Sequence, residues 1–216
     1  MKYKLKELRP KVFCVTVKNQ FDLSLLFWRY QEYYECGSKK FKGKQFTLLE
    51  YMKWYCKKHG DGSFSYPDDY IGFNVPSYVI RDVLWGHVDN NPDYNEYDDV
   101  MQKIDDELLE RTKNEEYYLI GVTGKDKKVV AHEVSHGLYF TNESFRTEMN
   151  GVLRTIPEKK YKKFKKVLKG LGYAKSVHDD EIIAYCSTGL HPSMKKINIP
   201  GKTIKKFKEV YKTYTT

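Results

Sequence analysis

Two short apolar runs bounded by polar or turn-forming residues predict β-strands in this chain. They cover residues 11–17 and 117–123, and a Gly-Lys-Asp turn closes the second run. Residues 64–75 are rich in aromatic side chains and interrupted by Pro67 and Gly72, which predicts short strands or an ordered loop. The strand pattern therefore predicts a small sheet.

Helical periodicity covers most of the remaining sequence, because apolar residues recur three or four positions apart. The predicted helices span residues 21–34, 47–58, 77–85, 95–112, 127–140, 142–156, 158–168, 179–186 and 203–214. Residues that commonly cap or terminate helices stand at several of their ends. Asn19 or Asp22 can cap the first helix, residues 60–62 stop the second, and Gly170 and Gly172 follow the seventh.

The length and continuity of the pattern predict a single domain over residues 1–216. A chain of 216 residues can bury a hydrophobic core without metal or disulfide support, and it contains no internal repeat and no long linker. The predicted sheet and the helix at 127–140 belong to an N-terminal lobe, about 1–141. Residues 142–216 form a helical C-terminal lobe, so we expect a mostly helical α+β fold with a cleft between the lobes.

His132, Glu133 and His136 form the sequence His-Glu-Val-Ser-His inside the predicted helix at 127–140. Two histidines four residues apart lie one turn above each other on a helix, so both imidazoles can bind one metal ion while Glu133 faces the same site. A separate apolar stripe on this helix consists of Val130, Val134 and Leu138. Because that stripe can be buried while the motif lines a cleft, the pattern predicts a zinc hydrolase site.

A catalytic zinc ion needs a third protein ligand and an open position for water. The metzincin pattern would continue with a third histidine, but Tyr139 and Asn142 occupy the later positions and exclude that class. Glu181 is the best candidate, because it begins the short helix at 179–186, whose apolar residues can hold it against the core. The alternative third ligands are Asp179, Asp180, His178 and Glu143.

With Glu181 as third ligand, residues 117–189 resemble the zincin metallopeptidases of the gluzincin type, in which a downstream helix supplies a glutamate to the zinc ion. The resemblance implies a zincin-like fold, a Zn²⁺ cofactor and a small sheet beside the active-site helix. It also implies that a strand next to this helix pairs with an extended peptide substrate, and residues 117–123 stand in the matching place. Gluzincins often carry an aspartate four residues after the ligand glutamate, where this chain has Tyr185. Asp180 or Tyr185 can instead orient a ligand histidine through its free ring nitrogen.

Glu133 is the expected general base of such a site. Zinc lowers the pKa of bound water, and a nearby carboxylate can take the proton and pass it to the leaving amine. The developing oxyanion also needs a hydrogen-bond donor. Tyr185 and His191 are the candidates because they follow the third-ligand helix closely, and His178 is next.

The net charge of +9 and the pI of about 9.1 suggest an anionic partner such as nucleic acid. Six of the 38 basic residues are arginine and 32 are lysine, whereas recognition of base edges favours arginine. The lysines of residues 158–169 and the acidic residues of 89–116 are typical of solvated helix faces. We therefore favour a peptidase, and the alternative is a basic nucleic-acid-binding or interaction protein with a structural or inactive metal site.

The remaining features add little chemistry. The four cysteines are scattered and are expected to be reduced thiols. His59 and His87 have no ligand spacing and are expected to have no role. No signal peptide or transmembrane segment is visible, so we expect an intracellular, cytoplasmic protein whose partner is a peptide or protein substrate and not a membrane. The oligomeric state stays open.

Overall fold

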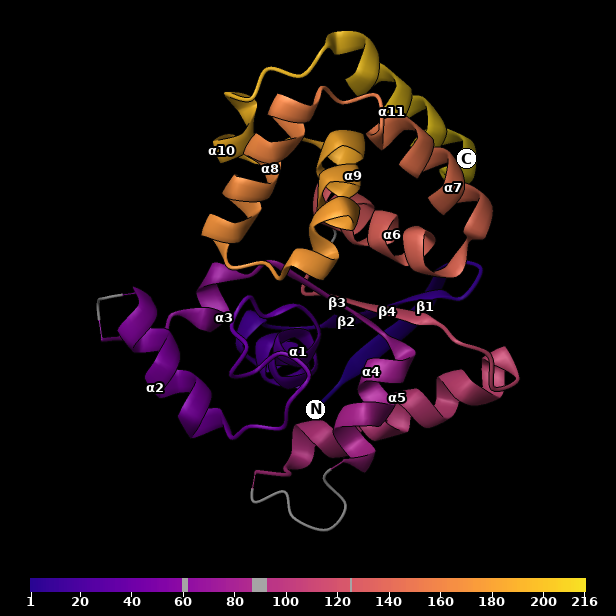
Figure 1. The fold of residues 1–216 in the computed structure, drawn as a ribbon. Helices are drawn as coiled ribbons and strands as arrows, with labels where there is room; N and C mark the ends of the chain where they lie inside the picture. The colour runs from indigo at the N-terminus through magenta and orange to yellow at the C-terminus, as the bar shows by residue number, and fades with distance from the viewer. Residues whose placement is uncertain (60–61, 87–92, 125) are drawn as a thin grey trace.

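The computed structural model describes residues 1–59, 62–86, 93–124 and 126–216. Helices cover both sides of a central sheet (Figure 1), with the C-terminal helices above it and most of the N-terminal helices below it in this view. Three predicted features lie partly outside the described residues: the helix end at 60–62, the acidic segment at 89–116 and the turn at 124–126. His87 lies wholly outside them.

The sheet has four strands in the order β1-β2-β4-β3. The strands are β1 (Tyr3–Arg9), β2 (Val12–Val17), β3 (Gly72–Pro76) and β4 (Tyr118–Val122). β2 and β4 are parallel, whereas β1 pairs with β2 and β3 pairs with β4 in antiparallel fashion. The strands predicted at 11–17 and 117–123 are confirmed, β3 lies at the end of the aromatic segment, and β1 was not predicted.

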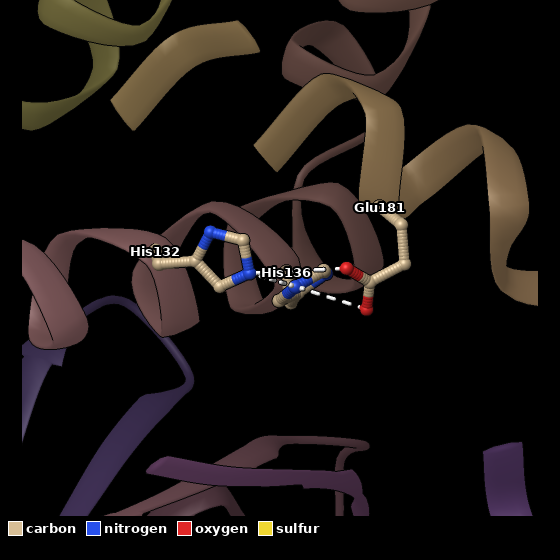
Figure 2. A group of neighbouring side chains, drawn as sticks. All are labelled: His132, His136 and Glu181. Carbon is tan, nitrogen blue, oxygen red and sulfur yellow. Dashed lines mark hydrogen bonds and ion pairs between the residues drawn. The ribbon is translucent and has the colours of Figure 1, made fainter. Parts of the chain in front are cut away.

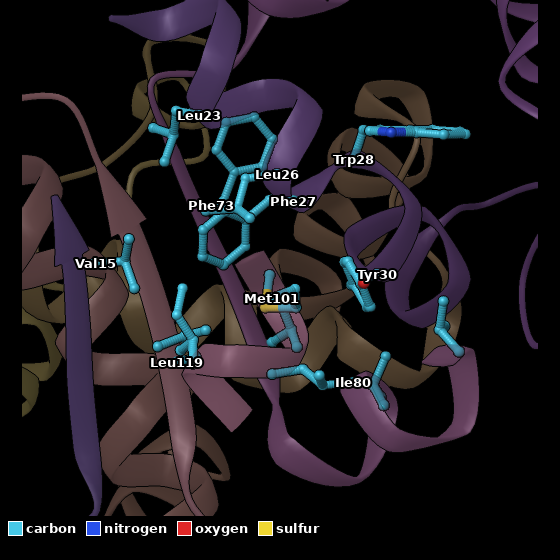
Figure 3. Packing of buried hydrophobic residues seen from close by; sticks show 14 of the residues in the cluster. Val15, Leu23, Leu26, Phe27, Trp28, Tyr30, Phe73, Ile80, Met101 and Leu119 are labelled. Carbon is cyan, nitrogen blue, oxygen red and sulfur yellow. The ribbon is translucent and has the colours of Figure 1, made fainter. Parts of the chain in front are cut away.

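Side chains alternate between the two faces of the sheet, so each face contributes to its own part of the core. Val15 and Leu119 point toward α1 (Gln20–Glu35) and the cluster shown in Figure 3. Tyr118 and Ile120 point to the other face, where α6 (Lys127–Thr141) covers the sheet. β2, β3 and β4 are therefore buried on both sides, whereas the edge strand β1 is partly exposed.

Two glycines let the covering helices approach the sheet closely. A Cβ atom on Gly121 in β4 would lie 2.4 Å from Cε2 of Phe27 in α1, and one on Gly137 in α6 would lie 2.5 Å from Cγ1 of Val12 in β2. Both distances are far below van der Waals contact. Because Gly137 has no side chain, α6 can pack this closely against β2.

The other helices divide between the two faces. The α1 side carries α2 (Leu48–His59), α3 (Tyr66–Asp69), α4 (Ser77–Trp85) and α5 (Glu96–Thr112). The α6 side carries α7 (Glu143–Leu153), α8 (Glu158–Leu171), the 3₁₀ turn η1 (Lys175–Val177), α9 (His178–Thr188), α10 (Pro192–Lys195) and α11 (Gly201–Thr215). All nine predicted helices are present, with ends that differ by at most three residues from those expected. The mostly helical α+β class is confirmed.

The position of β4 corrects one expectation. β4 pairs with β2 on one side and with β3 on the other, so its backbone groups are already engaged. Residues 117–123 therefore cannot bind an extended peptide by backbone pairing, and that prediction is wrong. β3 is the edge strand on this side of the sheet, and Asn74 at its centre donates its backbone N–H to Oε1 of Gln31, 3.0 Å away.

Across the part of the chain that the structure describes, no helix is both long and apolar enough to cross a membrane.

Candidate metal centre

His132, His136 and Glu181 come together between α6 and α9, as Figure 2 shows. The two histidine Nε2 atoms are 3.3 Å apart. Oε1 of Glu181 is 3.5 Å from Nε2 of His136, and Oε2 is 3.8 Å from Nε2 of His132. His136 and Glu181 are each only 2% exposed. Within the described residues, this is the group of three side chains whose geometry could hold a metal ion.

Local sequence explains why the two helices present these side chains to each other. Asp126 caps α6 by accepting a hydrogen bond from the Lys128 backbone N–H, and Val134 and Leu138 bury the side of α6 that faces the core. α9 is anchored by an apolar group of fully buried residues. This group consists of Ile182, Ile183, Ala184 and Cys186. Glu181, in the first turn of α9, is therefore directed at α6 by a helix that cannot rotate without exposing its core.

Three of the alternative third ligands, Asp179, His178 and Glu143, lie elsewhere. Asp179 accepts a hydrogen bond from the Tyr161 hydroxyl at 2.5 Å, and Nε2 of His178 lies 3.1 Å from the Tyr173 carbonyl oxygen. Glu143 is exposed at the start of α7.

Asp180 contacts His136, but at the ring nitrogen opposite the cluster. Its Oδ2 atom is 2.8 Å from Nδ1 of His136. Among the weighed candidates, the structure thus brings Glu181 to the two Nε2 atoms, and it gives Asp180 the position from which it can orient a histidine.

Hydrogen bonds assign the tautomer of each neutral histidine. The Thr188 hydroxyl donates to the Ala184 carbonyl oxygen at 2.7 Å, so its oxygen accepts from Nδ1 of His132, 3.3 Å away. The Asp180 carboxylate likewise accepts from Nδ1 of His136. With Nδ1 protonated in both rings, the neutral form of each ring carries its lone pair on Nε2. The two lone pairs therefore face the same small space.

The electrostatics of this space fit a cation. Oε2 of Glu181 is buried without a hydrogen-bond partner, and burial raises the pKa of Glu181 to about 8. Burial also lowers the pKa of His132 well below its usual value. For His136, burial acts in the same direction, but Asp180 and Glu181 outweigh it and raise its pKa. The carboxylates of Asp180 and Glu181 thus favour positive charge at His136.

Two imidazoles and one carboxylate are a ligand set typical of zinc in hydrolases, and other divalent first-row ions accept the same donors. The nitrogen and oxygen atoms fit such an ion in number, protonation and burial. The group could hold a metal ion, with Asp180 and Thr188 fixing the ring orientations from outside.

Glu133 is held beside the centre by a defined chain of hydrogen bonds. The Tyr118 hydroxyl donates to Oδ1 of Asn74, which leaves the Asn74 amide to donate to Oε2 of Glu133 at 2.8 Å. Gly72 makes room for the other oxygen, because a Cβ atom there would lie 2.6 Å from Oε1 of Glu133. Glu133 is 6% exposed, and burial raises its pKa. The contacts of Asn74 and Gly72 with Glu133 had no signal in the sequence.

An open cleft of about 920 Å³ borders the centre, and its wall includes His132, Glu133, Tyr185 and His191. The Tyr185 ring lies 4.5 Å from the His132 ring, and the His191 ring lies 5.9 Å from the Tyr185 ring, measured between centroids. Burial raises the pKa of Tyr185, so its hydroxyl keeps its proton. The two predicted oxyanion donors therefore lie at the cleft, whereas His178 is buried away from its wall.

Comparison with known proteins finds no family model, no curated protein and no solved structure that matches this chain. The case for the site consequently depends on its own geometry.

Proposed function

We propose that this protein is a zinc-dependent metallopeptidase of zincin type that hydrolyses peptide bonds in the cleft beside α6. The observation that carries the proposal is the convergence of three lone-pair atoms from His132, His136 and Glu181 next to a buried Glu133 and a cleft of about 920 Å³. These groups come from two helices, and His132 and Glu133 among them line the cleft. That combination of ligand set, adjacent carboxylate and open volume is what metal-assisted hydrolysis requires.

The roles of the side chains follow from their positions. Bound zinc would supply a water molecule of lowered pKa and a Lewis acid for the substrate carbonyl. Glu133 would accept the proton of that water and transfer it to the leaving amine, because its carboxylate is held as an acceptor by Asn74. Tyr185 and His191 would donate hydrogen bonds to the carbonyl oxygen as negative charge develops on it.

The proposal is tested by zinc stoichiometry and peptide hydrolysis in three variants. We expect one zinc ion per chain in the wild type and in Glu133→Gln, and a loss of tight binding in Glu181→Ala. Glu133→Gln should lose activity by a factor of roughly 10² to 10⁴, the usual contribution of a general base. Glu143→Gln is the matched control, since Glu143 is exposed on the neighbouring helix. A wild type without bound metal, or full activity in Glu133→Gln, would refute the proposal.

The alternative is a binding protein for an anionic partner, and the distribution of charge favours it. Residues 158–216 contain 15 lysines and five acidic residues, which places the whole positive excess of the chain in the C-terminal helices. In α8, however, Phe164 is fully buried and the Tyr161 hydroxyl is bonded to Asp179, so neither aromatic ring is presented for stacking on bases. Absence of RNA or DNA binding at low ionic strength would exclude this alternative.

A further inference from the structure

The last two turns of α1 place two buried carboxylates in the wall of the cleft. Glu32 is 4% exposed and Glu35 is 7% exposed, and both line the same cleft as His132 and Glu133. Among the described residues, neither carboxylate forms an ion pair with a lysine, arginine or histidine. Buried carboxylates normally have a cationic partner, so this arrangement calls for an explanation.

The hydrogen bonds of these carboxylates orient them without neutralising them. The Gln31 amide donates to Glu35, and the Cys36 thiol and the Tyr51 and Tyr66 hydroxyls lower the pKa of Glu32 from close by. None of these groups is charged. Burial raises the pKa of each carboxyl group, and for Glu35 the neighbouring Glu181 raises it further.

The nearby lysines are held by other groups. Nζ of Lys42 donates to the Tyr34 carbonyl oxygen and to the Ser176 hydroxyl, 2.8 Å away in the second case. Nζ of Lys58 lies 4.8 Å from the centre of the Trp54 ring. Lys58 and His136 still lower the pKa values of Glu32 and Glu35, respectively, but neither of them forms an ion pair with these carboxylates. The pocket around Glu32 and Glu35 therefore has no cation bound directly to either carboxylate.

The rest of this wall is aromatic. Tyr55, Tyr70 and Tyr173 line the cleft together with the two carboxylates. Aromatic surfaces pack well against the alkyl part of a lysine or arginine side chain, while carboxylates bind its charged end. The cleft wall also includes Lys128 and Lys195, and neither forms an ion pair with Glu32 or Glu35. A long cationic side chain matches both the apolar and the charged parts of the Glu32 and Glu35 pocket.

We propose that Glu35 and Glu32 form a specificity pocket that selects peptides with a lysine or arginine side chain close to the scissile bond. This inference rests on the proposed peptidase function, because the position of the bond is set by the metal centre. Glu35 is the primary determinant, because it is the last residue of α1 and adjoins the Cys36–Tyr173 bridge, whose residues line the same cleft. Glu32 lies one turn earlier on the same face of α1 and adds to the negative potential of the pocket.

A binding measurement tests the pocket without depending on catalysis. The zinc-loaded Glu133→Gln protein is titrated with a set of octapeptides that are otherwise uncharged, in which one lysine is moved through the sequence. A parallel set carries norleucine at the same positions. At one position the lysine peptide should bind roughly 10- to 100-fold more tightly than its norleucine counterpart, the effect of one hydrogen-bonded charge.

Glu35→Gln, combined with Glu133→Gln, should abolish most of this preference, and Glu32→Gln should reduce it. Glu50→Gln is the control, because Glu50 is exposed on α2 and does not line the cleft. Circular dichroism and thermal unfolding check that each variant is folded; a charge-removing substitution at a buried, unpaired carboxylate should not lower stability.

The outcomes separate this inference from the peptidase proposal. Hydrolysis by the wild type without any preference for lysine would overturn the pocket and leave the peptidase function intact. Lysine preference that survives in Glu35→Gln would also overturn it. Binding that prefers lysine but is not followed by hydrolysis in the wild type would support the pocket and refute the peptidase. Failure of every peptide to bind would overturn the pocket.

Discussion

Replacing Asp180 by asparagine should weaken metal binding without removing any metal ligand. Oδ2 of Asp180 lies 2.8 Å from Nδ1 of His136, and both side chains are largely buried. The carboxylate stabilises the tautomer that presents the Nε2 lone pair and makes that nitrogen more basic. Substitution of such outer partners typically lowers metal affinity by about 10- to 100-fold, which corresponds to roughly 1.4–2.7 kcal/mol. Asparagine keeps the size and can still accept a hydrogen bond, so the change isolates the charge.

The assay is competition for zinc against a chromophoric chelator of known affinity at a fixed pH, on protein shown to be folded by circular dichroism. Asp179→Asn is the matched control, because Asp179 is the adjacent carboxylate and its contacts with Tyr161 and Lys165 lie away from the centre. Its zinc affinity should equal that of the wild type. Wild-type affinity in Asp180→Asn, or an equal loss in both variants, would refute the reasoning.

Three further predictions concern the centre and its support. Zinc affinity should fall as the pH is lowered from about 8 to 6, because burial raises the pKa of Glu181 to about 8 and a protonated carboxyl group cannot bind the ion; pH-independent affinity in the same competition assay would contradict this. Gly137→Ala should lower the free energy of unfolding by about 1–2 kcal/mol in urea titrations, because its methyl group would meet β2 at 2.5 Å and the strain exceeds the gain in helix propensity. Gly151→Ala, with open space around it, should instead be neutral or stabilising, and equal effects at the two glycines would count against this packing. Gly72→Ala should retain zinc but lower kcat, because its methyl group displaces Glu133, and unchanged peptide hydrolysis would be the contrary result.

The elements of the fold were predictable because their signals are local. For example, α5 has a capping box in which Asn95 and Asp98 satisfy each other's backbone N–H groups. The motif helix and the helix of Glu181 were recognisable in the same way, from their periodicity and buried apolar residues. β1 also carries a local signal, since Tyr3 and Leu5 alternate with lysines, although the strand was not predicted.

The arrangement of these elements was not predictable, because it depends on contacts between distant parts of the chain. The strand order, which makes β3 and not β4 the edge of the sheet, has no counterpart in the periodicity of either segment. The partners of the site are equally remote in sequence. Asn74 is 59 residues from Glu133, and Thr188 is 56 residues from His132. A single asparagine or threonine has no spacing that distinguishes it from a solvated residue.

The central claim is that His132, His136 and Glu181 bind one zinc ion, and anomalous diffraction from crystals grown with zinc tests it most directly. Data collected on both sides of the zinc absorption edge should show one strong peak between α6 and α9. The account predicts that this peak lies about 2.0–2.2 Å from Nε2 of both histidines and from a carboxylate oxygen of Glu181. No peak at this position, or a zinc ion bound without Glu181, would contradict it.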